Sequence, residues 1–286
     1  MVDVDPTSSV SDPFCGIASY DGHDGTDIRV AQLLDTAVAG RVVAAAPGVV
    51  RAVRDGEPDR LVQTDADRQA VGERGCGNGV VIDHDGGLQT QYCHLAEGTI
   101  SVGEGDQVAA GDYVGTIGLS GITQFPHLEF IVRRQDVVVD PFSGRTGGEN
   151  AEGCDAAGEP LWADQSVTAA AARTTALIGV GFSSAPIEHD TLMMADPAGL
   201  FRGAEAIVAW AWAINVTAGD IFRIALSGPD GFSFIHESEP LTRTQAAYSI
   251  FAGQRSIAVP GEYTGTVQLV RGGEVVDAAV FNEVVE

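Results

Sequence analysis

The sequence predicts a mainly β protein of two domains, and three observations support this fold class. The 286 residues include 44% hydrophobic residues, 36 glycines and 12 prolines, a composition typical of a globular, turn-rich protein. Short stretches of β-branched and aromatic residues alternate with Gly-rich turns, and helix-like stretches are almost absent. Residues 143–160 are rich in Gly, Glu and Ala, as linkers are. We therefore expect domains at 1–145 and 171–286, with a linker at 146–170.

The first domain is predicted to begin with an irregular lead-in over residues 1–19. The predicted elements that follow are two strands in 38–53 around Pro47-Gly48, a long loop at 54–75, two strands in 77–95 turned at Asp85-Gly86-Gly87, a hairpin at 99–119, and the last strands in 125–142. Strands dominate this region. It is therefore expected to form an antiparallel sheet with one solvated cleft.

The second domain returns to strand-like alternation after residue 174. Residues 208–214, 221–226 and 263–270 show strand-like alternation of their side chains, with turns at 228–231 and 272–273. About seven short strands at turn spacing predict a β-sandwich, immunoglobulin-like in general shape. We find no catalytic motif in this part of the sequence.

Two separate segments carry residues suited to a metal or acid/base site. Residues 125–132 read as a strand, in which His127 and Glu129 share one face because side chains alternate along a strand. His23 and Asp27 lie four residues apart in a Gly-rich segment. A histidine and a carboxylate in each of two distant segments are the parts from which such a site is assembled.

Four motifs in this region resemble those of the M23 (lysostaphin/LytM-like) zinc metallopeptidases. They are His23-x-Gly25-x-Asp27, Tyr92-Cys93-His94-Leu95, the hairpin-like Asp106–Gly115, and Pro126-His127-Leu128-Glu129-Phe130. Their order is that of the family, and they span roughly residues 20–142. The resemblance implies a β-sheet core with a Zn²⁺ ion on its concave face. One position departs from the family pattern, because Glu129 stands where the family has the second histidine of H-x-H.

The resemblance assigns roles to five residues. His23 and Asp27 would bind zinc, Glu129 would occupy the third ligand position, and His94 and His127 would act as catalytic residues that orient water and move protons. Carboxylates are ordinary zinc ligands, so Glu129 can bind the ion, although a second carboxylate makes zinc a weaker Lewis acid. Alternatively His127 is the ligand and Glu129 the base, and the sequence does not separate these arrangements.

The resulting functional hypothesis is a zinc metalloendopeptidase that hydrolyses peptide bonds in bacterial cell-wall peptidoglycan. The alternative, motivated by Glu129, is a catalytically degenerate M23-like protein that binds cell wall or regulates another hydrolase. In a third interpretation the C-terminal sandwich is the functional domain, and it binds a protein or a glycan. The sequence does not indicate the oligomeric state.

Charge and hydropathy narrow the choice of partners. The formal net charge of −24 disfavours nucleic acid and anionic lipid as partners. Apolar stretches are short and interrupted, so no membrane span is expected. The first residues have no signal-peptide pattern, which leaves a cytosolic protein or a chain written without its signal.

The four cysteines bear on the compartment. If the strands in 77–95 form a hairpin, Cys76 and Cys93 can pair, which leaves Cys15 to pair with Cys154. Two disulfides imply an oxidising compartment, so a periplasmic or secreted location is expected. Four buried free thiols remain the alternative.

Overall fold

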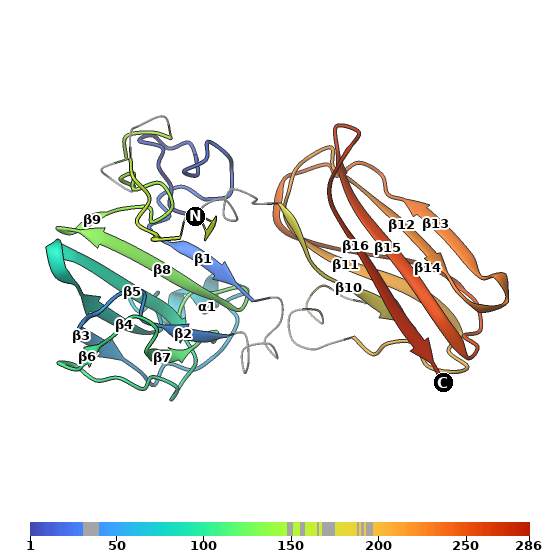
Figure 1. The fold of residues 1–286 in the computed structure, drawn as a ribbon, viewed down its shortest axis with the longest axis horizontal. Helices are drawn as coiled ribbons and strands as arrows, with labels where there is room; N and C mark the ends of the chain where they lie inside the picture. Colours follow the sequence, from blue (N-terminus) through green and yellow to red (C-terminus); the bar gives the residue numbers. More distant parts are fainter. Residues whose placement is uncertain are drawn as a thin grey trace. The chain divides into compact units, whose positions relative to one another are not determined.

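The computed structural model describes residues 1–30, 40–147, 151–154, 158–164, 166–167, 175–187, 189, 192 and 197–286. It divides the chain into two compact units, Met1–Ala172 and Arg173–Glu286 (Figure 1). The predicted limits of the domains and linker stay predictions. Leu161 and Trp162, which belong to the predicted linker, pack against the hydrophobic core of the first unit.

A seven-stranded antiparallel sheet forms the first unit, in the order β1-β8-β5-β4-β3-β6 with β9 paired to β8 (Figure 1). The strands are β1 (Thr26–Arg29), β3 (Gly48–Arg54), β4 (Asn78–Asp83), β5 (Leu88–Leu95), β6 (Gln107–Val108), β8 (His127–Arg134) and β9 (Val137–Val138), with a 3₁₀ turn, η2 (Asp85–Gly87), between β4 and β5. On β8, Leu128, Phe130 and Val132 enter the hydrophobic core. His127 and Glu129, which alternate with these residues along β8, belong to the opposite face.

Two expectations about this unit are wrong. Residues 99–119 do not form a hairpin, because β6 pairs with β3 whereas β7 (Tyr113–Thr116) pairs with β2 (Arg41–Val43) in a separate two-stranded sheet. Residues 54–75 are not all loop, because they contain α1 (Asp65–Val71). A reciprocal capping box between Thr64 and Asp67 starts this helix, and Val71 buries its end.

The second unit contains two antiparallel sheets around one core, the predicted sandwich. Their orders are β10-β11-β14 and β13-β12-β15-β16 (Figure 1). The elements are β10 (Ala176–Ser183), β11 (Ala206–Val216), β12 (Ile221–Ser227), η4 (Pro229–Gly231), β13 (Ser233–Glu237), β14 (Gln245–Arg255), β15 (Gly261–Arg271) and β16 (Glu274–Val285). Ala209 and Ala211 from the first sheet and Phe222 and Val267 from the second meet in the shared core.

Both expected disulfides are present. Cys15 is bonded to Cys154 across 139 residues, and Cys76 to Cys93 across 17 residues. The alternative of four free thiols is therefore wrong. Among the described residues, no helix combines the length and apolar character needed to cross a bilayer.

Candidate metal centre

The floor of the candidate site is a row of side chains across three neighbouring strands. Asp27 on β1 is directly opposite Glu129 on β8, and Glu129 is opposite Cys93 on β5. Directly opposed residues of an antiparallel pair extend their side chains to the same face. The sheet register therefore places both carboxylates side by side, next to the disulfide of Cys93.

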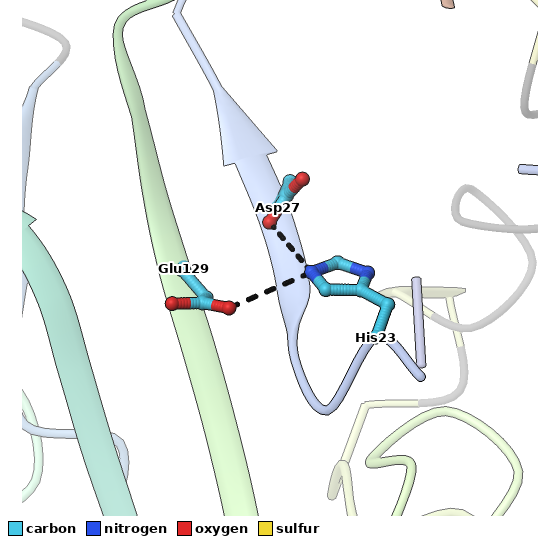
Figure 2. A group of neighbouring side chains, drawn as sticks. All are labelled: His23, Asp27 and Glu129. Atoms are coloured by element: carbon cyan, nitrogen blue, oxygen red, sulfur yellow. Dashed lines mark ion pairs between the residues drawn. The ribbon is translucent and has the colours of Figure 1, made fainter. Parts of the chain in front are cut away.

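His23 completes a compact cluster with these two carboxylates (Figure 2). Its Nε2 atom lies 3.2 Å from Asp27 Oδ1 and 3.6 Å from Glu129 Oε1. One potential ligand atom from each residue lies within 4.8 Å of the others. The structure thus brings together the three predicted metal ligands.

The two predicted catalytic histidines adjoin this cluster. His94 Nε2 lies 3.5 Å from Glu129 Oε2, and His127 Nε2 lies 3.7 Å from Asp27 Oδ1. Their rings are 4.7 Å apart between centroids. All five predicted site residues therefore meet on one face of the sheet.

All three imidazoles are held in the same way. His23 Nδ1 lies 2.7 Å from the carbonyl of Met1, His94 Nδ1 2.8 Å from that of Ser120, and His127 Nδ1 2.7 Å from that of Phe125. A carbonyl oxygen only accepts hydrogen bonds, so each Nδ1 donates its proton to the main chain and each ring turns its Nε2 atom toward the cluster. Such backing bonds orient metal-binding and proton-accepting histidines.

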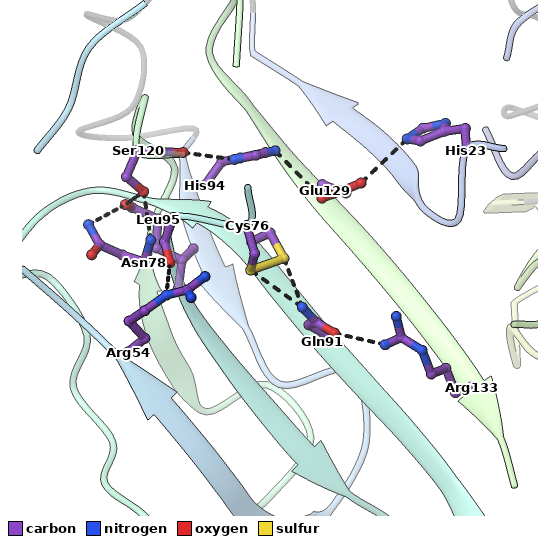
Figure 3. Close-up of a disulfide and its surroundings, with 12 residues drawn as sticks. His23, Arg54, Cys76, Asn78, Gln91, His94, Leu95, Ser120, Glu129 and Arg133 are labelled. Atoms are coloured by element: carbon purple, nitrogen blue, oxygen red, sulfur yellow. Dashed lines mark hydrogen bonds and ion pairs between the residues drawn. A yellow bond between two sulfur atoms is a disulfide. The ribbon is translucent and has the colours of Figure 1, made fainter. Parts of the chain in front are cut away.

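A buried polar network supports His94 from behind (Figure 3). The Ser120 hydroxyl donates to the carbonyl of Leu95 at 2.7 Å and accepts from the main-chain N–H of Asn78 at 2.9 Å. The Asn78 side chain donates to the carbonyls of Leu95 and Glu57. Because Asn78 and Ser120 are fully buried, the loop whose carbonyl holds His94 has little freedom to move.

The Cys76–Cys93 disulfide has its own hydrogen-bonded neighbour (Figure 3). The Gln91 amide donates to both sulfur atoms, at 3.4 and 3.2 Å, and its oxygen accepts from Arg133 at 2.7 Å. The main-chain N–H of His94 also donates to the carbonyl of Cys76. The disulfide therefore ties the segment after α1 to the strand that carries His94.

The electrostatic coupling within the cluster is strong. Burial alone would lower the pKa of His23, but contact with the carboxylates of Asp27 and Glu129 raises it to about 9. Burial would raise the pKa of both carboxyl groups, but the nearby histidines hold both below their ordinary values. Burial lowers the pKa of His127 to about 4, although the carboxylate of Asp27 opposes that shift.

The cluster has the properties of a cation site. His23 Nε2 and Asp27 Oδ1 are buried and make no hydrogen bond, although they face each other at 3.2 Å. Buried polar atoms that lack a partner are costly, and a shared cation would satisfy both. One imidazole and two carboxylates form an acceptable donor set for zinc. The residues present therefore fit a divalent cation.

Gly25 makes room for Glu129 in this arrangement. A Cβ atom at position 25 would lie 2.7 Å from Glu129 Cγ and 3.3 Å from Glu129 Oε1. Neither distance allows an ordinary contact for a carboxylate in its present place. The glycine of the His23-x-Gly25-x-Asp27 motif therefore allows the main chain before β1 to lie close to the Glu129 side chain on β8.

A cavity of about 520 Å³ opens over the cluster. It is lined by Asp27, His94, His127 and Glu129, together with residues that the sequence did not single out. The latter are Tyr20, Arg68, Gly75, Ile122, Thr123, Gln124 and Phe125. The Tyr20 ring also stacks on His23 at 4.2 Å. Arg68 lies on α1, which the pattern Thr64-x-x-Asp67, a capping-box signature, could have indicated.

Comparison with known families identifies this region. The sequence of residues 21–141 matches Peptidase family M23. These residues form an M23 peptidase family domain. The match includes all five residues of the cluster described above, and Glu129 is among them. The resemblance seen in the four sequence motifs is therefore confirmed.

The proteins similar to this M23-containing chain include bacterial peptidases. It is 38% identical over 69 residues to the DD-carboxypeptidase/endopeptidase Mpg of Neisseria meningitidis serogroup B, a stretch covering 24% of this chain and 15% of that protein. A zinc containing peptidase from Vibrio cholerae is 26% identical with a TM-score of 0.31, covering 47% of this chain and 33% of that one. The catalytic domain of lysostaphin from Staphylococcus simulans is 21% identical with a TM-score of 0.29, covering 42% and 75%.

Proposed function

We propose that this protein is a zinc metalloendopeptidase that hydrolyses peptide bonds in bacterial cell-wall peptidoglycan, in the periplasm or outside the cell. The observation that carries the proposal is the convergence of three imidazole Nε2 atoms and two carboxylates under one open cavity of an M23 domain. The two disulfides support an oxidising compartment. The peptidase name of the Neisseria relative supports the substrate class.

In this proposal the site residues divide into metal ligands and proton-transfer residues. His23, Asp27 and Glu129 would hold Zn²⁺, which supplies a polarised scissile carbonyl and a more acidic water when bound. The Nε2 lone pairs of His94 and His127 face the same cavity and are free of the main-chain bonds that occupy Nδ1. One of them would accept a proton from the attacking water as the C–O bond forms. It would then return that proton to the leaving amine nitrogen as the C–N bond breaks.

Glu129 favours a second candidate, a degenerate M23 domain that binds cell wall or regulates another hydrolase. With Asp27 and Glu129 both ionised, a divalent cation in the cluster would be formally neutralised. A neutralised zinc ion polarises a carbonyl less than one held by a single carboxylate. A protein that binds peptidoglycan fragments without cleaving them would fit this second candidate.

The deciding experiment is the metal content of the full chain purified without chelators, compared with a Glu129→His variant. About one zinc per chain in the parent, together with release of new amino groups from peptidoglycan, would support the peptidase. Zinc in the variant alone would support the degenerate domain. His23→Ala should lose both metal and hydrolysis, whereas His236→Ala, on β13 of the second unit, serves as the matched histidine control. Hydrolysis that survives His23→Ala would refute the mechanism.

A further inference from the structure

Arg68 places a cationic side chain in the wall of the cavity above the metal cluster. It lies on α1, three residues before the buried Val71, and the capping box at Thr64 and Asp67 fixes where the helix begins. Residues three apart on a helix lie on the same side of it, and Arg68, which is itself exposed, lines the cavity. Arg68 thus belongs to a helix and not to a loop.

The guanidinium of Arg68 forms no ion pair within the part of the chain that the structure describes. The neighbouring Asp67 is already engaged, because its carboxylate accepts from the main chain and hydroxyl of Thr64 and from the main chain of Gln63. Arg74, a little further along the chain, differs in this respect, since it binds Glu57 at 2.9 Å. Arg68 therefore has its charge-assisted hydrogen bonds available to a ligand.

The charges of the side chains that line the cavity indicate what kind of ligand would bind to Arg68. The described residues that line the cavity include two carboxylates, Asp27 and Glu129, and one arginine, Arg68. A divalent cation would neutralise the two carboxylates and leave the arginine as the net positive charge of the cavity. An uncharged peptide segment gives that charge no partner. A free carboxylate does, because guanidinium groups bind carboxylates through paired N–H donors.

We infer that Arg68 forms a subsite for a free carboxylate of the peptide substrate, with the Tyr20 hydroxyl across the same cavity as a second hydrogen-bonding group. The substrate class is then a short peptide with a carboxylate near the scissile bond, in preference to an uncharged bridge. This inference rests on the proposed function only in taking the ligand to be a peptide. Arg68 is a specificity residue, and it takes no part in the bond-breaking step.

The test compares binding of N-acetyl-D-alanyl-D-alanine with that of its C-terminal amide, by NMR titration of the full chain in zinc-loaded and chelator-treated forms. The parent should bind the acid about fivefold more tightly than the amide, the size expected for an exposed ion pair. Arg68→Gln should bring that ratio close to one, and Arg68→Lys should keep part of it. Raising the salt concentration should reduce the parent's ratio, because salt screens exposed charges.

The matched control is Arg74→Gln, which removes an arginine that is paired and does not line the cavity. It should keep the parent's ratio. An unchanged ratio in Arg68→Gln, or no binding of either peptide at millimolar concentration, would overturn the inference. If the carboxylate preference depends on Arg68 but peptidoglycan is never cleaved, the subsite stands and the peptidase proposal fails. If peptidoglycan is cleaved but no carboxylate preference is found, the peptidase proposal stands and the subsite inference fails.

Discussion

Replacing Gly25 with alanine should weaken zinc binding by about 10- to 100-fold, the loss typical when a group that positions a ligand is changed. The new Cβ would lie 2.7 Å from Glu129 Cγ and 3.2 Å from Ile131 Cγ1. Carbon atoms in contact are ordinarily about 3.5–4.0 Å apart, so Glu129 must retreat by about 1 Å. Glu129 Oε1 is now 3.6 Å from His23 Nε2, and such a retreat takes it away from the ligand position.

The assay is the zinc dissociation constant, measured by competition with a chromophoric chelator. Gly103→Ala is the matched control, because its Cβ would meet only Asp106 Oδ2, at 3.7 Å. Combining Gly25→Ala with Glu129→Asp shortens the displaced side chain and should recover part of the affinity. Since Gly25 does not adopt a positive φ, alanine can take its backbone conformation, and unfolding by urea should show a folded variant. An unchanged dissociation constant for Gly25→Ala would refute a role for Glu129 as ligand.

Three further predictions concern stability. Serine at Cys15 and Cys154 should destabilise the first unit by about 5 kcal/mol in urea, against about 3 kcal/mol for loss of the 17-residue disulfide, and a reversed order would contradict the loop-entropy argument. Ser120→Ala should cost about 1–3 kcal/mol in the same assay because it leaves a buried main-chain N–H unpaired, and a neutral effect would show that water replaces the hydroxyl. Burial would raise the pKa of Asp220, but the ion pair with Arg271 lowers that pKa below 3.8. The contribution of this ion pair to folding stability is therefore present above that pH and is lost as the pH falls further. The Asp220→Asn variant should not show this loss of stability in acid. An acid unfolding curve like the parent's would contradict the prediction.

The placement of several side chains in the candidate site was predictable because side chains alternate every two residues along a strand. The alternation on β8 correctly placed His127 and Glu129 on one face, and the four motifs brought in His23 and Asp27. The expected hairpin between β4 and β5 gave the Cys76–Cys93 disulfide. These inferences need only the alternation of side chains within a strand and the pairing of two strands that follow each other in the sequence.

The remaining features depend on partners that local patterns do not reveal. Strict alternation would place His94 in the core with Tyr92, but His94 has a φ of 63° at a register shift between β4 and β5, and it lines the cavity instead. The alternation in residues 99–119 could not show that β6 and β7 join different sheets. The carbonyl of Met1, which orients His23, is backbone and has no sequence signal.

The site is built from two kinds of structure that can change independently. The paired strands β1, β8 and β5 supply the carboxylates and the neighbouring disulfide, and a slip of one residue would turn every one of these side chains to the other face. The cavity wall comes from elsewhere, with Tyr20 in the segment before β1 and Arg68 on a seven-residue helix. Substitutions in that wall leave the strand pairing untouched. The shape and charge of the cavity can therefore change while the cluster of His23, Asp27 and Glu129 stays as it is.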